Sequence, residues 1–450
     1  MSIDTPIPTD GRDAADRRMI LQFRVSGPPR EIVFSEKETS RSLSYDGVPI
    51  DYYDRQGRLV GIFIDDRHYR RGLDNRLLEK FRRPGERVRV RRDVDEPRKR
   101  RLIDDAYSRA RSVAEEIRRG SLADLRAHGL DPSADARTLL LDKLGPILSY
   151  DYARLEEERR EFDRVYAPVS ILPPDQYMSL VIQITIGCSW SRCTFCDFYR
   201  GRPFRIRTPE ELRGHIRGAL GFLGESATLR RSVFLADGNA LVIPQGKLLD
   251  RLAVVHEFFA FTPPEIEGRA ARAAWRRAHP GSFEGLYSFL DAFSTLKKSV
   301  ADFEALRARH LRRVYVGLES GNDELLRFLR KPGDAAGMIE ATRIIKSAGL
   351  AVGIVIMVGV GGEGFAQQHA RDTVAVVNEM GLGEGDFVYL SDFVNHPGLP
   401  YERMAREAGI GDLPHAAVIA QRERLRAGFR WRDPAHPPQV ALYDIREFVY

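Results

Sequence analysis

Residues 181–200 read VIQITIGCSWSRCTFCDFYR and contain all three cysteines of the chain, Cys188, Cys193 and Cys196. The apolar, β-branched run before them predicts a buried strand that delivers a cysteine loop at its carboxyl end. Gly187 comes directly before the first thiol, and we expect it to let the backbone turn sharply there. The rest of the chain is expected to be organised around this stretch.

Three thiols at the spacing C-x4-C-x2-C are typical of a ligand set. A structural zinc site takes four ligands, yet no fourth cysteine exists, and His215, the nearest downstream histidine, falls in an expected helix. A disulfide framework would leave one thiol over. Thiolates favour iron–sulfur clusters, and a cubane cluster on three cysteines leaves one iron open to a non-protein ligand. The remaining alternative is three buried core cysteines, although core packing gives no reason for such clustering.

These residues resemble the radical S-adenosylmethionine (SAM) superfamily, whose common spacing is C-x3-C-x2-C with an aromatic residue before the last cysteine. Here Phe195 is that aromatic residue, and the first gap is one residue longer. The resemblance implies a [4Fe-4S] cluster on Cys188, Cys193 and Cys196, with SAM on the open iron. It also implies reductive cleavage of SAM to a 5′-deoxyadenosyl radical that abstracts hydrogen from a substrate. An electron donor such as flavodoxin or ferredoxin would supply the electron, and Phe195 would pack on SAM or shield the cluster.

Composition indicates an ordinary globular protein. The chain has 450 residues, of which 43% are hydrophobic and 30% charged, enough for a large core and more than one domain. No apolar run is long enough to span a membrane, so no membrane partner is expected. The first residues, MSIDTPIPTDGRDAADRR, lack the apolar core of a signal peptide. We therefore expect a cytoplasmic protein, in a reducing compartment that suits an oxygen-sensitive cluster.

The positive charge of the chain is concentrated in one segment. Residues 82–101 contain 10 basic and 4 acidic residues, which equals the net charge of +6 of the whole chain. Such a run can bind nucleic acid, but it also fits a solvated hairpin with an Arg-rich edge. The hairpin is the preferred interpretation, because no aromatic residues interleave with the arginines as single-strand stacking would require.

Patterns along the chain predict five segments. Residues 1–17 are expected to be disordered, and 18–101 to form a small β-rich domain. Residues 102–170 are expected to be a helical linker, and 171–400 the catalytic core. Residues 401–450 are expected to pack on that core as a C-terminal extension.

In the core, predicted strands alternate with predicted helices, which is typical of an α/β fold with a parallel sheet. Thr208 and Glu211 form a capping box at the first helix. Six strand–helix units are expected, which suits the partial (β/α)6 barrel, a TIM-like fold, that the family resemblance implies. The later predicted strands are 232–241, 287–294, 312–320, 351–360 and 386–393.

Functional residues of such folds gather at the carboxyl ends of the strands. Asp237, Gly238 and Asn239 follow the second strand, where the family often has Gly-Gly-Glu in contact with the methionine amino group of SAM. A β-to-α turn explains these residues equally well. Glu319 and Ser320 lie in GLESG, which resembles a family pattern in contact with the ribose or methionine of SAM, although Ser320 could instead cap a helix. Further Gly-rich and Pro-Gly segments follow the last two strands, at 359–363 (beginning with Gly359) and 396–400.

The sequence leaves the substrate unknown and assigns no catalytic side chain. Oxidoreductase, transferase and lyase chemistry all stay open. The three cysteines leave none for a second cluster, and no cobalamin-binding signature is present. The alternative function is a non-catalytic iron–sulfur or zinc protein that binds nucleic acid through its basic N-terminal region. That alternative leaves the strand-end motifs without a purpose.

Overall fold

The computed structural model describes residues 19–26, 31–83, 89–129 and 135–450, so the expected disordered tail, 1–17, lies outside the described residues. The chain divides into two compact units. The N-terminal unit comprises the chain up to Phe162 with residues 224–229 and 449, and the core unit comprises 163–223, 230–448 and 450.

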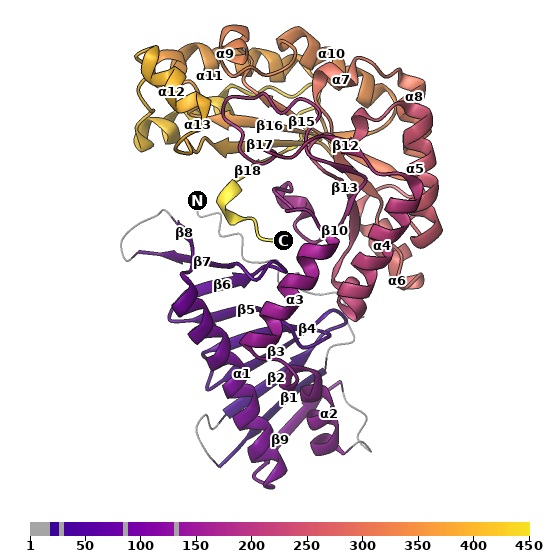
Figure 1. Ribbon diagram of the computed structural model, residues 1–450, viewed down its shortest axis with the longest axis vertical. Coiled ribbons are helices and arrows are strands. Elements are labelled where there is room, and N and C mark those ends of the chain that lie inside the picture. Colours follow the sequence, from indigo (N-terminus) through magenta and orange to yellow (C-terminus); the bar gives the residue numbers. More distant parts are fainter. Residues whose placement is uncertain (1–18, 27–30, 84–88, 130–134) are drawn as a thin grey trace. The chain divides into compact units, whose positions relative to one another are not determined.

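The N-terminal unit is built on a nine-stranded antiparallel sheet (Figure 1). Strands β1 to β8 follow one another as a meander, and β9 pairs with the outer edge of β1. The strands are β1 (Met19–Arg24), β2 (Glu31–Glu36), β3 (Ser40–Tyr45), β4 (Ile50–Asp54), β5 (Leu59–Ile64), β6 (Arg67–Arg71), β7 (Leu77–Arg82), β8 (Arg89–Asp93) and β9 (Ala123–His128).

Three helices cover one face of this sheet, α1 (Glu96–Arg118), α2 (Ala136–Leu148) and α3 (Tyr152–Val165) (Figure 1). Asp95 begins α1, because its side chain accepts a hydrogen bond from the N–H of Arg98. Side chains of α1 such as Ile103 and Val113 share one apolar core with Leu43 and other side chains of the sheet.

Two expectations for this part of the chain need correction. Residues 102–170 are not uniformly helical, because 123–128 form strand β9, whose sequence ADLRAH contains no β-branched residue that would indicate a strand. The helices also do not form a separate linker, since they share a core with the sheet. In addition, the sequence did not indicate β3, where serines alternate with Arg41, Leu43 and Tyr45 and the buried set is short.

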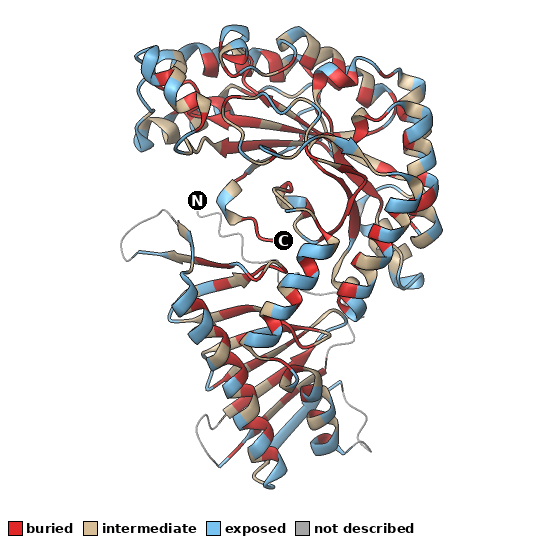
Figure 2. Cartoon of the chain, in the orientation of Figure 1, coloured by how far each residue is buried: buried red, intermediate tan, exposed pale blue. Residues whose placement is uncertain are grey.

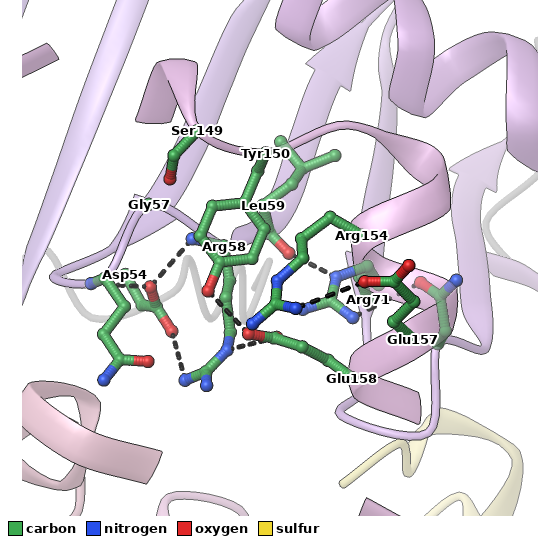
Figure 3. A network of polar contacts seen from close by, with 12 residues as sticks. Asp54, Gly57, Arg58, Leu59, Arg71, Ser149, Tyr150, Arg154, Glu157 and Glu158 are labelled. Atoms are coloured by element: carbon green, nitrogen blue, oxygen red, sulfur yellow. Dashed lines mark hydrogen bonds and ion pairs between the residues drawn. The ribbon is translucent and has the colours of Figure 1, made fainter. Parts of the chain in front are cut away.

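A buried polar network fastens α3 to the hairpin β4–β5 (Figure 3). Arg58 donates from Nε to Glu158 Oε2 at 2.5 Å, and its Nη1 lies 3.5 Å from Asp54 Oδ2. Tyr150 donates its hydroxyl to the other oxygen of Glu158 at 2.6 Å. These buried charges are therefore paired, as their removal from water requires.

The core unit contains a seven-stranded parallel sheet, β10 (Ser179–Gln183), β13 (Ser232–Ala236), β14 (Leu286–Phe289), β15 (Leu311–Glu319), β16 (Ala351–Val358), β17 (Phe387–Asp392) and β18 (Gln439–Leu442), in that order. The six expected strands are all present, and the seventh, β18, comes from the C-terminal extension. Strands β10 and β18 are the two edges of the sheet. The α/β class and the parallel sheet are confirmed.

Helices run along the outer side of this sheet (Figure 1). They are α4 (Pro209–Leu223), α5 (Gln245–Phe258), α6 (Arg269–Ala278), α7 (Ala292–Thr295), α8 (Val300–Ala308), α9 (Asp323–Phe328), α10 (Ala335–Ser347), α11 (Gly362–Glu379), α12 (Pro400–Glu407) and α13 (His415–Gly428).

Burial follows from these layers. Six strands of the core sheet, β10 and β13 to β17, are mostly buried, whereas the edge strand β18 is not, and the helices show exposed outer faces (Figure 2). The predicted capping box at α4 is confirmed, because Thr208 Oγ1 accepts from the N–H of Glu211 at 3.2 Å and Glu211 Oε2 accepts from the N–H of Thr208 at 2.9 Å. Among the described residues, none of the helices combines the length and apolarity that a membrane span requires.

Candidate active site

The cysteine loop leaves the sheet at the end of β10. Thr185–Ile186 (β11) pairs antiparallel with Arg205–Ile206 (β12), and this short ribbon closes the base of the loop. Gly187 has a φ of +74°, and a Cβ there would lie 2.6 Å from the carbonyl oxygen of Arg202. The sharp turn expected at Gly187 therefore exists, and no side chain fits at that position.

The loop is fastened to its surroundings within its longer first gap and just after Cys193. Trp190 donates its indole N–H to the carbonyl of Arg330 at 2.8 Å, and the N–H of Thr194 donates to the carbonyl of Leu329 at 3.0 Å. Ser189 Oγ accepts from the amide of Asn239 at 2.9 Å. Ser189 and Trp190, which lie in the longer gap, thus contact the segments that follow β13 and α9.

All three cysteines are free thiols and line one cavity of about 210 Å³. Burial raises the pKa of the Cys193 thiol to about 11 and that of the Cys196 thiol to about 12. These thiols would stay protonated at neutral pH unless a metal displaced the proton, as coordination does. Among the residues that the structure describes, no group of three or more His, Cys, Asp or Glu side chains is arranged to hold a metal ion.

The cavity lies at the carboxyl ends of the strands. Its other lining residues include Phe195, Trp190, Tyr199, Gly238, Asn239, Phe289, Asp291, Tyr315, Glu319, Lys331, Val355, Met357, Asp392, Phe393, His396 and Tyr443. Each strand from β13 to β18 contributes lining residues to this cavity, from its carboxyl end or from the loop that follows it. The parallel sheet thereby brings together polar groups far apart in the sequence.

Of the residues after β13, Gly238 and Asn239 line the cavity, whereas Asp237 does not. Its carboxylate instead accepts from the N–H of Gly187 at 3.1 Å and from Arg202 Nη1 at 3.3 Å. Burial raises the pKa of Asp237 to about 6, although Arg202 and the Gly187 N–H act in the opposite direction. Asp237 therefore holds the base of the cysteine loop.

Asn239 is oriented by a carboxylate that the sequence did not indicate. Its side-chain amide donates to Asp291, and its Oδ1 accepts from the N–H of Asp291 at 3.1 Å. Asp291 in turn caps α7 by accepting from the N–H of Ser294 at 2.6 Å. No sequence signal pointed to Asp291, because it lay inside the strand predicted at 287–294, whereas β14 ends at Phe289 and Asp291 caps the following helix.

Glu319 reaches the cavity and forms a buried ion pair with Lys331 at 2.8 Å. The pKa of Lys331 is raised: burial lowers it, but the charges of Glu319 and nearby groups outweigh that effect. Gly317 makes room for the pair, because a Cβ there would lie 2.1 Å from Glu319 Oε1 and 2.8 Å from Lys331 Nζ. Lys331 lies on no strand, and its sequence position gave no sign of the pair.

Ser320 and Gly359 are not among the residues that line the cavity. Ser320 is fully buried, with its hydroxyl 2.8 Å from His369 Nδ1, and it also accepts from the N–H of Asn322 at 3.0 Å. The N–H of Gly359 donates to Gln421 at 2.7 Å. His215 is likewise structural, since its Nε2 accepts from the N–H of Gln183 at 3.0 Å.

The sequence profile of the radical SAM superfamily matches residues 182–374, a range that contains all three cysteines. Residues 182–374 form a radical SAM domain. A [4Fe-4S] cluster and SAM are the cofactors of this family, and enzymes of the family cleave SAM to start radical chemistry. No curated protein matches the chain significantly.

Several solved structures are similar to the chain. The cobalamin-dependent S-adenosylmethionine radical enzyme OxsB is 14% identical to the chain, with a TM-score of 0.34. The match covers 56% of this chain and 31% of the OxsB chain. Coproporphyrinogen III oxidase from Escherichia coli is 14% identical, with a TM-score of 0.37. That match covers 55% of this chain and 50% of the oxidase. Methylornithine synthase is 15% identical, with a TM-score of 0.37, and the match covers 67% of this chain and 81% of the synthase. The chain thus spans about a third of the length of the first of these structures.

Proposed function

We propose that the protein is a radical SAM enzyme in which Cys188, Cys193 and Cys196 hold a [4Fe-4S] cluster and SAM binds in the same cavity. The observation that carries the proposal is that three free thiols line one cavity together with Asn239 and the Glu319–Lys331 pair. These groups come from separate strand ends, where enzymes on parallel sheets place their active sites.

The three cysteines match a cubane cluster in the number and type of ligands. A cubane takes one thiolate per iron, so three cysteines leave one iron for the amino and carboxylate groups of SAM. When bound and reduced by one electron, the cluster and SAM would supply a 5′-deoxyadenosyl radical that abstracts hydrogen from the substrate. A donor such as flavodoxin or ferredoxin would provide the electron, in the reducing environment of the cytoplasm.

The remaining polar groups of the cavity suit the ends of SAM. Asn239 offers a fixed amide, because Asp291 and Ser189 hold it. Glu319 offers a carboxylate for an ammonium or a ribose diol, and Lys331 holds that carboxylate in place. Phe195 lines the same cavity and also packs on the apolar cluster of Leu325, Leu329, Met357, Val360, Tyr401 and Ala405, so its ring is held firmly as a wall for the adenosyl group.

Ser320 and Gly359 have a different role in this proposal. Their polar groups are satisfied within the protein, by His369, Asn322 and Gln421. We assign them to positioning the ends of β15 and β16 rather than to direct contact with SAM. Asp237 similarly positions Gly187 at the base of the cysteine loop.

The apolar part of the lining excludes water. Phe289, Tyr315, Val355, Met357 and Tyr443 lie on the cavity, and Tyr443 donates its hydroxyl to the carbonyl of Leu172 at 2.8 Å. A site closed to water limits side reactions of a reactive intermediate. We propose that the substrate carbon lies against this apolar side.

The test is anaerobic reconstitution of the full-length protein with iron and sulfide, followed by SAM and a strong reductant. We expect four irons per chain, a spin-resonance spectrum that shifts on adding SAM, and 5′-deoxyadenosine as a product. Cys188→Ala should lose the cluster and the product. Because the chain has no fourth cysteine, the exposed Arg343→Ala on α10 serves as the control and should keep both.

Tightly bound zinc, or a cluster whose spectrum ignores SAM, would contradict the proposal. Either outcome would favour the non-catalytic metalloprotein that binds nucleic acid.

A further inference from the structure

One face of the N-terminal sheet packs on the three helices. On the opposite face, strand pairing decides which side chains are neighbours. Side chains alternate along strands, so residues next to the core-facing Tyr53, Ile62 and Tyr69 point to the other face. Direct pairing places one row of these residues across neighbouring strands: Ser44, Ile50, Phe63, His68, Lys80 and Arg91. The adjacent row is Ser42, Tyr52, Gly61, Arg70 and Leu78. We call the β4–β8 part of this surface the open face.

Aromatic rings lie at the centre of the open face. Tyr52 is 37% exposed, and it lies beside Gly61, where an added Cβ would come within 3.8 Å of the tyrosine ring. Phe63 contacts His68, with ring centroids 4.6 Å apart and planes inclined by 37°. Because Gly61 has no side chain, no side chain stands beside the Tyr52 ring at this position on the neighbouring strand.

Cationic side chains border these rings on one side. Arg70, Lys80, Arg82 and Arg91 all belong to β6, β7 or β8 and point to the open face. Among the described paired positions of these three strands, Asp93 is the one acidic residue on this face, and it forms an ion pair with Arg76 at 3.1 Å. Among the described residues of this border, cationic side chains therefore outnumber acidic ones.

We propose that the open face binds single-stranded nucleic acid. Successive bases stack on exposed rings regardless of sequence, while basic side chains follow the backbone. Tyr52, Phe63 and His68 supply the rings, and Lys80 and Arg91 continue the row into a cationic border. The sequence alone did not favour such binding, because no aromatic residue interleaves with the arginines along the chain. Strand pairing removes that objection, because it places rings from β4, β5 and β6 beside cations from β6, β7 and β8.

Binding at the open face does not depend on the proposed enzyme activity. It requires no cluster and no SAM, so it can be measured on the cluster-free protein and succeeds or fails separately from the reconstitution experiment. If both hold, the enzyme acts on, or is recruited by, a nucleic-acid strand.

The test is fluorescence anisotropy of the full-length protein with labelled single strands of about 15 nucleotides, a length that covers the usual site size. Oligouridylate and oligoadenylate RNA, their DNA counterparts and a blunt duplex are compared at several salt concentrations. We expect single strands to bind tighter than the duplex, with affinity falling as salt rises. Tyr52→Leu and Phe63→Leu should each weaken binding about tenfold, because stacking is lost while an apolar side chain remains.

The double variant Lys80→Ala/Arg91→Ala should also weaken binding and reduce the salt slope by about 0.7 for each lost phosphate contact. The matched control is Arg100→Ala, because Arg100 belongs to the same basic run but lies exposed on α1, away from the sheet. This control should change affinity less than twofold. Circular dichroism and melting curves identify any variant that has unfolded.

Four outcomes would overturn the proposal. They are no binding to any single strand at low salt, equal affinity for the duplex, equal loss with Arg100→Ala and Lys80→Ala/Arg91→Ala, and binding to anionic vesicles without binding to oligonucleotides. The last outcome would assign the open face to a membrane surface instead.

Discussion

At the scale of single residues, buried charges in both units are held by specific partners. In the core unit the Glu319–Lys331 pair lies on the cavity wall, and Gly317 is the residue that leaves it room. In the N-terminal unit Glu79 is fully buried and is reached by the arginines at 67, 92 and 98. Removing one partner from such a group leaves a charge without compensation.

Lys331→Met is therefore expected to destabilise the cluster-free core unit by about 3 kcal/mol, because the Glu319 carboxylate stays buried without its cation. Chemical denaturation at neutral pH measures the loss. Lys297→Met is the matched control, since Lys297 is exposed, and it should stay within about 0.5 kcal/mol of the wild type. Equal effects of the two substitutions would show that the ion pair is not what stabilises this wall.

Glu79 gives a prediction about pH. Burial alone would raise the pKa of Glu79, but hydrogen bonds from Arg92, Tyr69 and Arg67 lower it to about 2. A carboxyl group with a lowered pKa stabilises the folded state above its unfolded pKa, and this stability is lost as pH falls towards 2. Glu79→Gln should thus cost about 2 kcal/mol at pH 7, and its difference from the wild type should shrink between about pH 4.5 and pH 2. Thermal melts of the two proteins across that range would show a constant difference if the prediction is wrong.

At the scale of elements, the cysteine loop depends on the turns around it. Tyr199 lies three residues after Cys196, and its ring packs on Gly238 so closely that a Cβ there would lie 2.6 Å from Tyr199 Cε2. The same loop is fastened by Trp190 and Thr194 to the segment after α9. The cysteines are therefore positioned by the turn after β13 and by the segment after α9 together.

Gly238→Ala should displace Tyr199 and with it the last cysteine. We expect less iron per chain after reconstitution, while the far-ultraviolet circular dichroism stays that of the wild type. Gly246→Ala is the control, because Gly246 lies in helix α5 with no atom within 4 Å of an added Cβ. The Gly246→Ala variant should keep its full iron content, and its free energy of unfolding should be equal to that of the wild type or slightly higher. Full iron content in Gly238→Ala would mean that the loop tolerates movement of Tyr199.

At the scale of the whole molecule, the two units have separate cores. The core of the N-terminal unit is formed by its own sheet and helices, including Leu43. The core unit buries residues of its parallel sheet such as Ile354. Units with separate cores are expected to unfold in separate transitions.

Calorimetry of the full chain should accordingly show two transitions. Leu43→Ala is expected to cost about 3 kcal/mol and to lower only the transition of the N-terminal unit. Ile354→Ala should lower only the other transition. A single transition that moves with either substitution would show that the units fold as one.

The sequence by itself determined the cysteine set, the strand–helix alternation and the capping box at Thr208, because each depends on residues close together in the chain. It also determined that a turn was needed at Gly187. Tertiary structure decided which strand-end residues share the cavity, since Asp291 and Lys331 reach it only through pairing across the sheet. It likewise decided that α1 packs on the N-terminal sheet instead of forming a linker, and that the rings and cations of the open face lie side by side. These arrangements depend on strand register and helix docking, which join residues distant in sequence and so leave no local signal.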